Sequence, residues 1–184
     1  MDISIWYFAN LWVTESRLAL KRVTNMKVIF SHGKESGPWG SKIKRLADTE
    51  SSQGCGVDSI DYSGITSPDA RVEKLSNHLM AEQEPFVLVG SSMGGYVSMV
   101  AAEKFSPIGI FLLAPALYVD GYLHQEYKLD LPNITIVHGW SDEVIPMQNS
   151  IKYAQQAKCN LHLIDGDHRL NSSIVLVDDL FNIF

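Results

Sequence analysis

The sequence predicts an α/β protein in which a doubly wound, mostly parallel sheet of six strands has helices on both faces. The first observation is that short apolar runs alternate, from residue 26 onward, with longer segments of helical character. The second is that these runs are apolar throughout and rich in β-branched or aromatic residues, as in parallel strands buried on both faces. Right-handed crossovers leave few ways to arrange such strands, and we predict the order 2-1-3-4-5-6.

The predicted elements follow one another along the chain with short connections. The strands are expected at residues 28–30, 57–60, 86–89, 108–113, 134–137 and 161–164. The helices are expected at residues 39–49, 68–81, 93–105, 146–157 and 172–184. In the second helix Val72, Leu75 and Leu79 recur near the helical period, so one face can pack on the sheet.

Length, composition and charge fit one ordinary globular domain. The chain has 184 residues, 46% of them hydrophobic and 20% charged, which is enough for one substantial core. The net charge is -6, and the lysines and arginines are scattered along the chain. Because nucleic acids and anionic membranes bind clustered basic residues, we expect neither as a partner. The oligomeric state stays open.

The cysteines and the N-terminus predict a cytoplasmic protein. Cys55 and Cys159 form no CxxC pair and lack the spacing of a zinc site or a disulfide framework, which fits a reducing compartment. The apolar run 3–13 is too short to span a bilayer. It follows Asp2 without the basic region or cleavage site of a secretory signal, so we expect no export.

The first 25 residues do not continue the alternating pattern. Residues 3–8 resemble a strand and residues 14–22 a helix, but neither leads into the later elements. Met26 directly precedes the first clear core strand, at 27–31. We therefore predict two parts, an N-terminal extension or wrongly assigned start at 1–25 and a single functional domain at 26–184.

A sharp turn between a predicted strand and a predicted helix, residues 90–95, carries the candidate nucleophile. A serine in such a turn has a strained backbone, and the residues two before and two after it lie too close together for side chains. Ser92 has Gly90 and Gly94 at these positions, whereas Ser91 has larger residues there. The spacing therefore selects Ser92.

Reactive side chains follow three of the predicted strands. In doubly wound sheets ligands bind beyond the carboxyl ends of the strands, where Ser92, Asp142 and His168 follow the third, fifth and sixth strands. A serine hydroxyl needs a base to take its proton, and an imidazole needs a carboxylate to fix its tautomer and stabilise its charged form. Asp165 and Asp167 are alternatives to Asp142, but residues adjacent to a histidine rarely point toward its ring.

These motifs resemble the α/β-hydrolase superfamily, whose nucleophile turn is G-x-S-x-G and whose triad follows the chain order Ser, Asp, His. The resemblance covers residues 26–184, and the size is similar to that of small, nearly lidless serine esterases. It implies a minimal α/β-hydrolase fold, with Ser92 as nucleophile, His168 as general base and Asp142 as the acid that orients the base.

The resemblance also implies an oxyanion hole. Residues 31–34, Ser-His-Gly-Lys, resemble the family's HG turn, in which the N–H after the glycine binds the oxyanion. That donor is the backbone N–H of Lys34. The second is the N–H of Met93, at a helix start whose dipole favours negative charge. His32 and His138 are expected to be turn residues packed near the site.

The remaining candidate ligands have ordinary interpretations. A metal site built from His162, Asp165, Asp167 and His168 would lack any established ligand spacing, so we expect no metal and no organic cofactor. The long connection at 114–132 is expected to cover the site in part. Core packing is the first interpretation of Trp39, Trp140 and Tyr118, and an acyl pocket is the alternative.

The expected activity is hydrolysis of a small-molecule carboxylic ester or thioester through an acyl-enzyme on Ser92. Two alternatives stay open. One is a binding or scaffold protein that keeps the hydrolase fold without turnover, and the other is a peptidase or acyltransferase. The substrate and its acyl-chain length depend on the pocket walls, which the sequence does not define.

A chain that begins at Met26 is expected to fold like the full chain, because the alternating pattern starts there. Circular dichroism melts of the two chains should give similar unfolding midpoints. Failure of the shortened chain to fold would show that residues 1–25 are part of the core.

Overall fold

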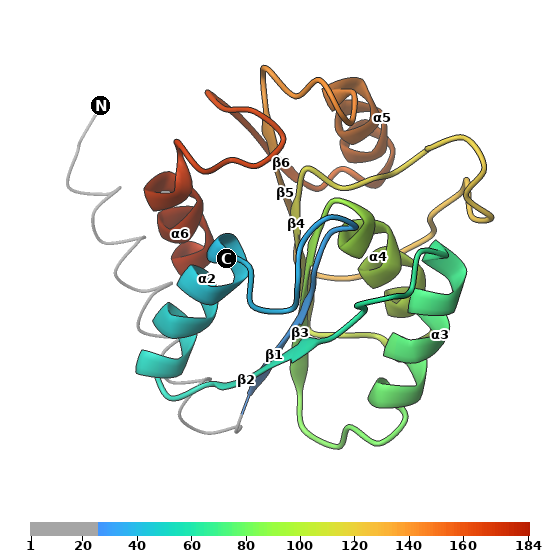
Figure 1. The fold of residues 1–184 in the computed structure, drawn as a ribbon, viewed down its shortest axis with the longest axis vertical. Coiled ribbons are helices and arrows are strands. Elements are labelled where there is room, and N and C mark those ends of the chain that lie inside the picture. The colour runs from blue at the N-terminus through green and yellow to red at the C-terminus, as the bar shows by residue number, and fades with distance from the viewer. Residues whose placement is uncertain (1–25) are drawn as a thin grey trace.

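The computed structural model describes residues 26–184. It contains a parallel six-stranded sheet between two layers of helices, and the strand order β2-β1-β3-β4-β5-β6 confirms the predicted order (Figure 1). The strands are β1 (Lys27–Ser31), β2 (Gly56–Ile60), β3 (Phe86–Ser91), β4 (Gly109–Leu113), β5 (Ile134–Gly139) and β6 (Asn160–Ile164). The helices are α2 (Ser41–Ser52), α3 (Pro68–Leu79), α4 (Met93–Phe105), α5 (Met147–Ala157) and α6 (Ile174–Ile183).

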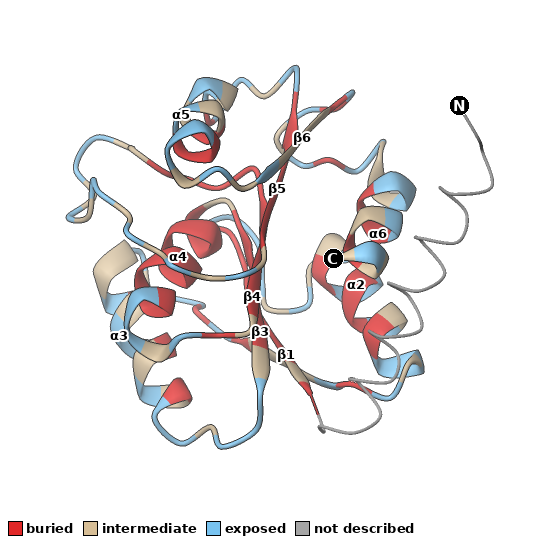
Figure 2. Ribbon diagram, turned by 180° about the vertical axis from the view of Figure 1, so that it is seen from behind, coloured by how far each residue is buried: buried red, intermediate tan, exposed pale blue. Residues whose placement is uncertain are grey.

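Each face of the sheet supports one apolar core. Helices α2 and α6 lie on one face, and α3, α4 and α5 on the other, with the buried strands between them (Figure 2). On the α3–α4 side, one row of register partners is Ile29, Leu88, Ile110 and Ile134. On the α2–α6 side, the next row is Phe30, Val89 and Phe111. Because successive residues serve opposite cores, the strands are apolar throughout.

The elements differ from the sequence prediction mainly at their ends. The helix predicted to begin at residue 39 begins at Ser41, because the preceding residues form a turn closed by the Gly40 N–H on the Gly37 carbonyl, 3.2 Å away. Strand β3 extends past the predicted 86–89, since Gly90 and Ser91 stay in register with β4. This extension carries the sheet up to the residue before Ser92.

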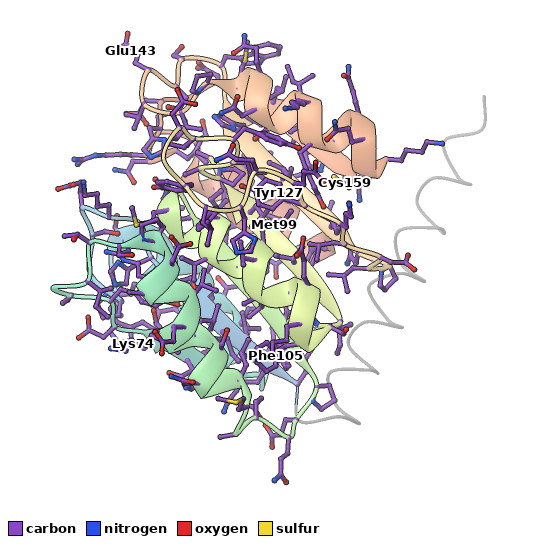
Figure 3. All side chains as sticks on the ribbon, turned by 90° about the vertical axis from the view of Figure 1, so that its right-hand side faces the viewer. Lys74, Met99, Phe105, Tyr127, Glu143 and Cys159 are labelled. Carbon is purple, nitrogen blue, oxygen red and sulfur yellow. The ribbon has the colours of Figure 1, made fainter. Side chains whose placement is uncertain are left out.

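The connection between β4 and β5 has no regular structure in its described residues, 114–133. Its tyrosines pack on α4 and α5. The Tyr122 ring lies 4.7 Å from that of Tyr96, and the Tyr127 ring 6.1 Å from that of Tyr153. Figure 3 shows Tyr127 on this side of the molecule, near Met99 of α4, in the same core cluster. These contacts hold the connection against the two helices.

The predictions for residues 1–25, including the apolar run 3–13 and the boundary before Met26, lie outside the described residues. Within 26–184 no helix is long and apolar enough to cross a bilayer. Cys55 is buried and Cys159 is half-buried.

Replacing Phe111 by alanine is expected to lower the free energy of unfolding by about 3–5 kcal/mol, because a buried aromatic side chain would leave a cavity. Phe111 is fully buried, and its ring lies 4.8 Å from that of Phe181 and 5.4 Å from that of Phe184. Urea unfolding measures the change. The exposed α6 residue Val175 provides the control, since Val175→Ala should cost less than about 0.5 kcal/mol. Equal effects of the two substitutions would contradict this description of the core.

Candidate active site

Ser92 occupies the single residue between β3 and α4. Its backbone has φ 55° and ψ -121°, a conformation that non-glycine residues rarely adopt. Backbone hydrogen bonds hold it there: the Ser92 N–H donates to the Leu113 carbonyl at 2.9 Å, and the Ser92 carbonyl accepts from the Ala116 N–H at 3.0 Å. The end of β4 and the residues directly after it thus hold the backbone of Ser92 in this conformation.

The glycines flanking Ser92 allow the turn to pack against its surroundings. A Cβ added to Gly90 would lie 2.5 Å from the Gly94 carbonyl oxygen and 2.6 Å from the Gly95 Cα. A Cβ added to Gly94 would collide with the backbone of Ser31 at the end of β1. Any side chain at either position would therefore push the turn away from the helix or from β1.

Ser92, His168 and Asp142 lie in one hydrogen-bonded row. The Ser92 Oγ is 2.9 Å from His168 Nε2, and His168 Nδ1 is 2.7 Å from Asp142 Oδ2. The carboxylate can only accept, so Nδ1 carries the proton and Nε2 faces the serine as an acceptor. The His168 side chain is 19% exposed and that of Asp142 fully buried. The turns after β3, β5 and β6 thus bring together the three residues singled out by the sequence.

The Asp142 carboxylate is satisfied on both oxygens. Oδ1 accepts from the Val144 and Ile145 N–H groups at 2.8 and 2.9 Å, while Oδ2 faces His168. Burial raises the pKa of Asp142, but the hydrogen bonds from Ile145, His168 and Val144 outweigh it and hold the pKa below the usual range. Asp142 is therefore an anion at neutral pH.

His138 is a further partner of this carboxylate. His138 was expected to be a turn residue, but it lies fully buried in β5. Its Nε2 is 3.0 Å from both Asp142 Oδ2 and the Ile145 carbonyl oxygen, and its Nδ1 is 2.7 Å from the Ser150 hydroxyl. Since a carbonyl only accepts, Nε2 is the donor and Nδ1 accepts from Ser150. Burial lowers the pKa of His138, so the ring is neutral. Its position at a strand end, four residues before Asp142, was the available sequence signal.

Asp165 and Asp167, the alternatives to Asp142, make other contacts. Asp167 Oδ1 accepts from the N–H groups of Arg169 and Leu170 at 2.9 and 3.0 Å, so it shapes the turn that carries His168. The Asp165 carbonyl accepts from the Ser173 hydroxyl. Within residues 26–184, no three His, Cys, Asp or Glu side chains are placed to hold a metal ion.

The predicted oxyanion donors flank Ser92. A Cβ added to Gly33 would lie 3.3 Å from the Ser92 Cβ, so the residue before Lys34 touches the serine. Met93 is the first residue of α4, where N–H groups lack helical acceptors. In the described part of the chain, neither the Lys34 nor the Met93 N–H has an acceptor. Both N–H groups therefore remain available to a ligand.

A cavity of about 790 Å³ opens beside Ser92 and His168. Three basic and three acidic residues line it: Lys34, Lys42, Arg169, Glu35, Glu143 and Asp167. Burial lowers the pKa of Lys42 to about 8, despite the opposing carboxylates of Asp167 and Asp142. The walls thus carry charges of both signs and also include apolar residues such as Ile43 and Val144.

The predicted cover and aromatic walls contribute little to this cavity. From the 114–132 connection, only Ala116 and Tyr122 line it, while the other tyrosines pack on α4 and α5. Trp39 and Trp140 are 50% and 55% exposed, so the prediction that they are core residues is wrong, and neither lines the cavity. Trp39 lies in the turn before α2, and Trp140 lies in the turn after β5.

No family model and no curated protein matches the sequence. Solved structures do match. A proposed hydrolase of the alpha/beta superfamily from Xanthomonas campestris pv. campestris is 27% identical to this chain, with a TM-score of 0.80; the match covers 87% of this chain and 96% of that chain. The chain has the α/β-hydrolase fold.

Two further solved structures share this α/β-hydrolase fold at lower identity. The ydeN gene product of B. subtilis is 16% identical, with a TM-score of 0.71 and coverage of 84% of this chain and 96% of that one. An α/β serine hydrolase without a lid from Xanthomonas campestris is 18% identical, with a TM-score of 0.69 and coverage of 86% and 80%. The resemblance inferred from the sequence is confirmed by the shared fold.

The neutral state of His138 predicts a pH-dependent stability. The folded pKa is lowered below the unfolded value of about 6.5, so this contribution is present above that pH and is lost as the pH falls toward the folded pKa. His138→Gln removes the contribution, and the difference in unfolding free energy between wild type and variant should shrink from pH 7.5 to about 5.5. Urea unfolding at both pH values measures it. A constant difference would contradict a neutral buried His138.

Proposed function

We propose that the chain is a serine hydrolase that cleaves a small carboxylic ester or thioester through an acyl-enzyme on Ser92. The observation that carries the proposal is the row from Ser92 through His168 to Asp142, which opens on a cavity. Its distances are within the hydrogen-bond reach that a nucleophile and its base require. The strained backbone of Ser92 also supports a functional role for this residue.

In the acylation step, the Ser92 oxygen attacks the substrate carbonyl as His168 Nε2 takes the hydroxyl proton. The ionised Asp142 stabilises the resulting imidazolium through Nδ1. The carbonyl oxygen becomes an anion held by the Lys34 and Met93 N–H groups, each of which contributes roughly 3 kcal/mol. His168 then gives its proton to the leaving alcohol or thiol as the C–O or C–S bond breaks, leaving an acyl ester on Ser92.

Deacylation repeats these steps with water. His168 takes a proton from a water molecule that attacks the acyl carbonyl, and the same two N–H groups hold the second oxyanion. When the bond to the Ser92 oxygen breaks, His168 returns the proton to this oxygen and the carboxylic acid leaves. The enzyme regains its starting protonation state, so His168 alone can carry the proton in both halves of the cycle.

The cavity supports a small substrate rather than a polypeptide. Its volume of about 790 Å³ lies in the range that binds small molecules. The turnover proposal is also favoured over a scaffold role, because Ser92 and His168 line the same cavity as Lys34 and Met93, whose N–H groups are the candidate oxyanion donors. A binding protein would have no need to hold a serine in a strained conformation.

Ser92→Ala is expected to abolish labelling by a fluorophosphonate probe and to lower kcat for a short-chain aryl ester roughly 10⁴-fold or more. The reason is that the probe and the acyl group both form their bond to the Ser92 oxygen. Gel fluorescence and spectrophotometric assays measure the two effects. Ser91→Ala is the matched control, since it removes the adjacent hydroxyl and should leave labelling in place. A folded Ser92→Ala protein that is labelled like the wild type would refute the assignment.

A further inference from the structure

Arg71 on α3 is a buried cation that has no acidic partner within residues 26–184. It is 2% exposed, and among the described residues no carboxylate lies within ion-pair distance of its guanidinium. Burying a charge is costly unless hydrogen bonds compensate. Here Nε donates to the Ile65 carbonyl at 2.7 Å, and the guanidinium carbon lies 5.1 Å from the centre of the Tyr62 ring. The remaining hydrogen bonds of Arg71 are made to the turn that carries the candidate oxyanion donor Lys34.

Arg71 Nη1 lies 3.2 Å from the carbonyl oxygens of both His32 and Gly33. These two carbonyls belong to the turn after β1, and the Gly33 carbonyl forms one peptide unit with the Lys34 N–H. The described residues contain no cis peptide bond, so this carbonyl and this N–H point in opposite directions. Since the carbonyl points to the buried guanidinium, the N–H points away from it, which fits the position of Lys34 on the cavity wall.

His32 holds the same carbonyl from a second direction. The side chain is 1% exposed, and its Nε2 accepts from the Tyr62 N–H at 2.9 Å. A backbone N–H only donates, so Nδ1 carries the ring proton and donates to the Gly33 carbonyl at 2.7 Å. The Gly33 oxygen therefore receives two hydrogen bonds, one of them from a cation, and rotation of the peptide would break both.

We propose that Arg71 is a positioning residue that orients the Gly33–Lys34 peptide and strengthens the Lys34 N–H as an oxyanion donor. This inference rests on the proposed function. A charged donor on the carbonyl oxygen draws electron density through the amide group and makes the N–H a better donor. The positive charge of Arg71 also lies on the carbonyl side of the Gly33–Lys34 peptide, opposite the side on which the oxyanion would bind. The effect concerns a charge that forms only in the transition state, so it acts on kcat rather than on substrate binding.

Arg71→Met is expected to lower kcat for p-nitrophenyl acetate roughly 10- to 100-fold and to change KM less than about 3-fold. The affinity for phenylboronic acid, whose tetrahedral adduct on Ser92 carries a charged oxygen, should fall by a similar factor. In the ligand-free protein, the Lys34 amide proton resonance should move upfield, because its carbonyl partner is less polarised. Arg71→Lys keeps the charge. Its kcat, its affinity for phenylboronic acid and its Lys34 amide proton shift should lie between those of Arg71→Met and the wild type.

Leu75→Ala provides the matched control for lost packing. Leu75 is fully buried one helical turn after Arg71, in the apolar core cluster, and its truncation should lower the unfolding midpoint without lowering kcat. A wild-type kcat in folded Arg71→Met, or an unmoved Lys34 resonance, would overturn the inference. If Arg71→Met does not fold, Arg71→Lys decides. A wild-type kcat together with a wild-type Lys34 resonance in Arg71→Lys would overturn the inference, and a lowered kcat with a shifted Lys34 resonance would support it. A wild type that takes no probe and hydrolyses no ester refutes the proposed function, while the Lys34 resonance still tests the Arg71 contact.

Discussion

Close backbone contacts between strand ends, made possible by glycines, determine the geometry of the site. Gly94 packs on the backbone at the end of β1, which places the turn of Ser92 beside the turn of Lys34. Gly139 makes the equivalent contact between β5 and the turn after β6, since a Cβ there would lie 2.7 Å from the Asp167 carbonyl oxygen. The turns carrying Asp142 and His168 are thereby brought together. Two contacts thus set the spacing of side chains that are far apart in the sequence.

The fold could be predicted because its determinants are local or repetitive. Strands serving two cores need apolar residues at every position, and this pattern predicted all six strands and their order. The ends of elements were predicted less well, because they depend on hydrogen bonds such as that between Gly40 and Gly37, and on register with a neighbouring strand. The residues of the candidate site could be found for a similar reason, since the carboxyl ends of parallel strands meet at one edge.

Arg71 could not be found in this way, and for His138 the sequence predicted a place near the site but not its hydrogen-bond partners. In the helical pattern of α3 an arginine predicts an exposed position, yet Arg71 is buried. Two of the three carbonyls that accept its hydrogen bonds belong to a turn 38 and 39 residues earlier in the chain. The partners of His138 likewise include a backbone carbonyl and the hydroxyl of Ser150. Every residue carries a carbonyl, so no residue type marks such an acceptor. Contacts to backbone carbonyls are therefore the part of a site that sequence patterns reveal least.

The two buried histidines, His32 and His138, contribute hydrogen bonds to the site as neutral rings. His32 on the oxyanion side and His138 on the carboxylate side each have one nitrogen committed as a donor and the other as an acceptor. Burial lowers the pKa of both, so each contributes a directed hydrogen bond without adding positive charge. A cationic His138 would neutralise Asp142 and weaken its attraction for the imidazolium of His168. Because His138 stays neutral, the negative charge of Asp142 remains available to the imidazolium that forms when Ser92 loses its proton.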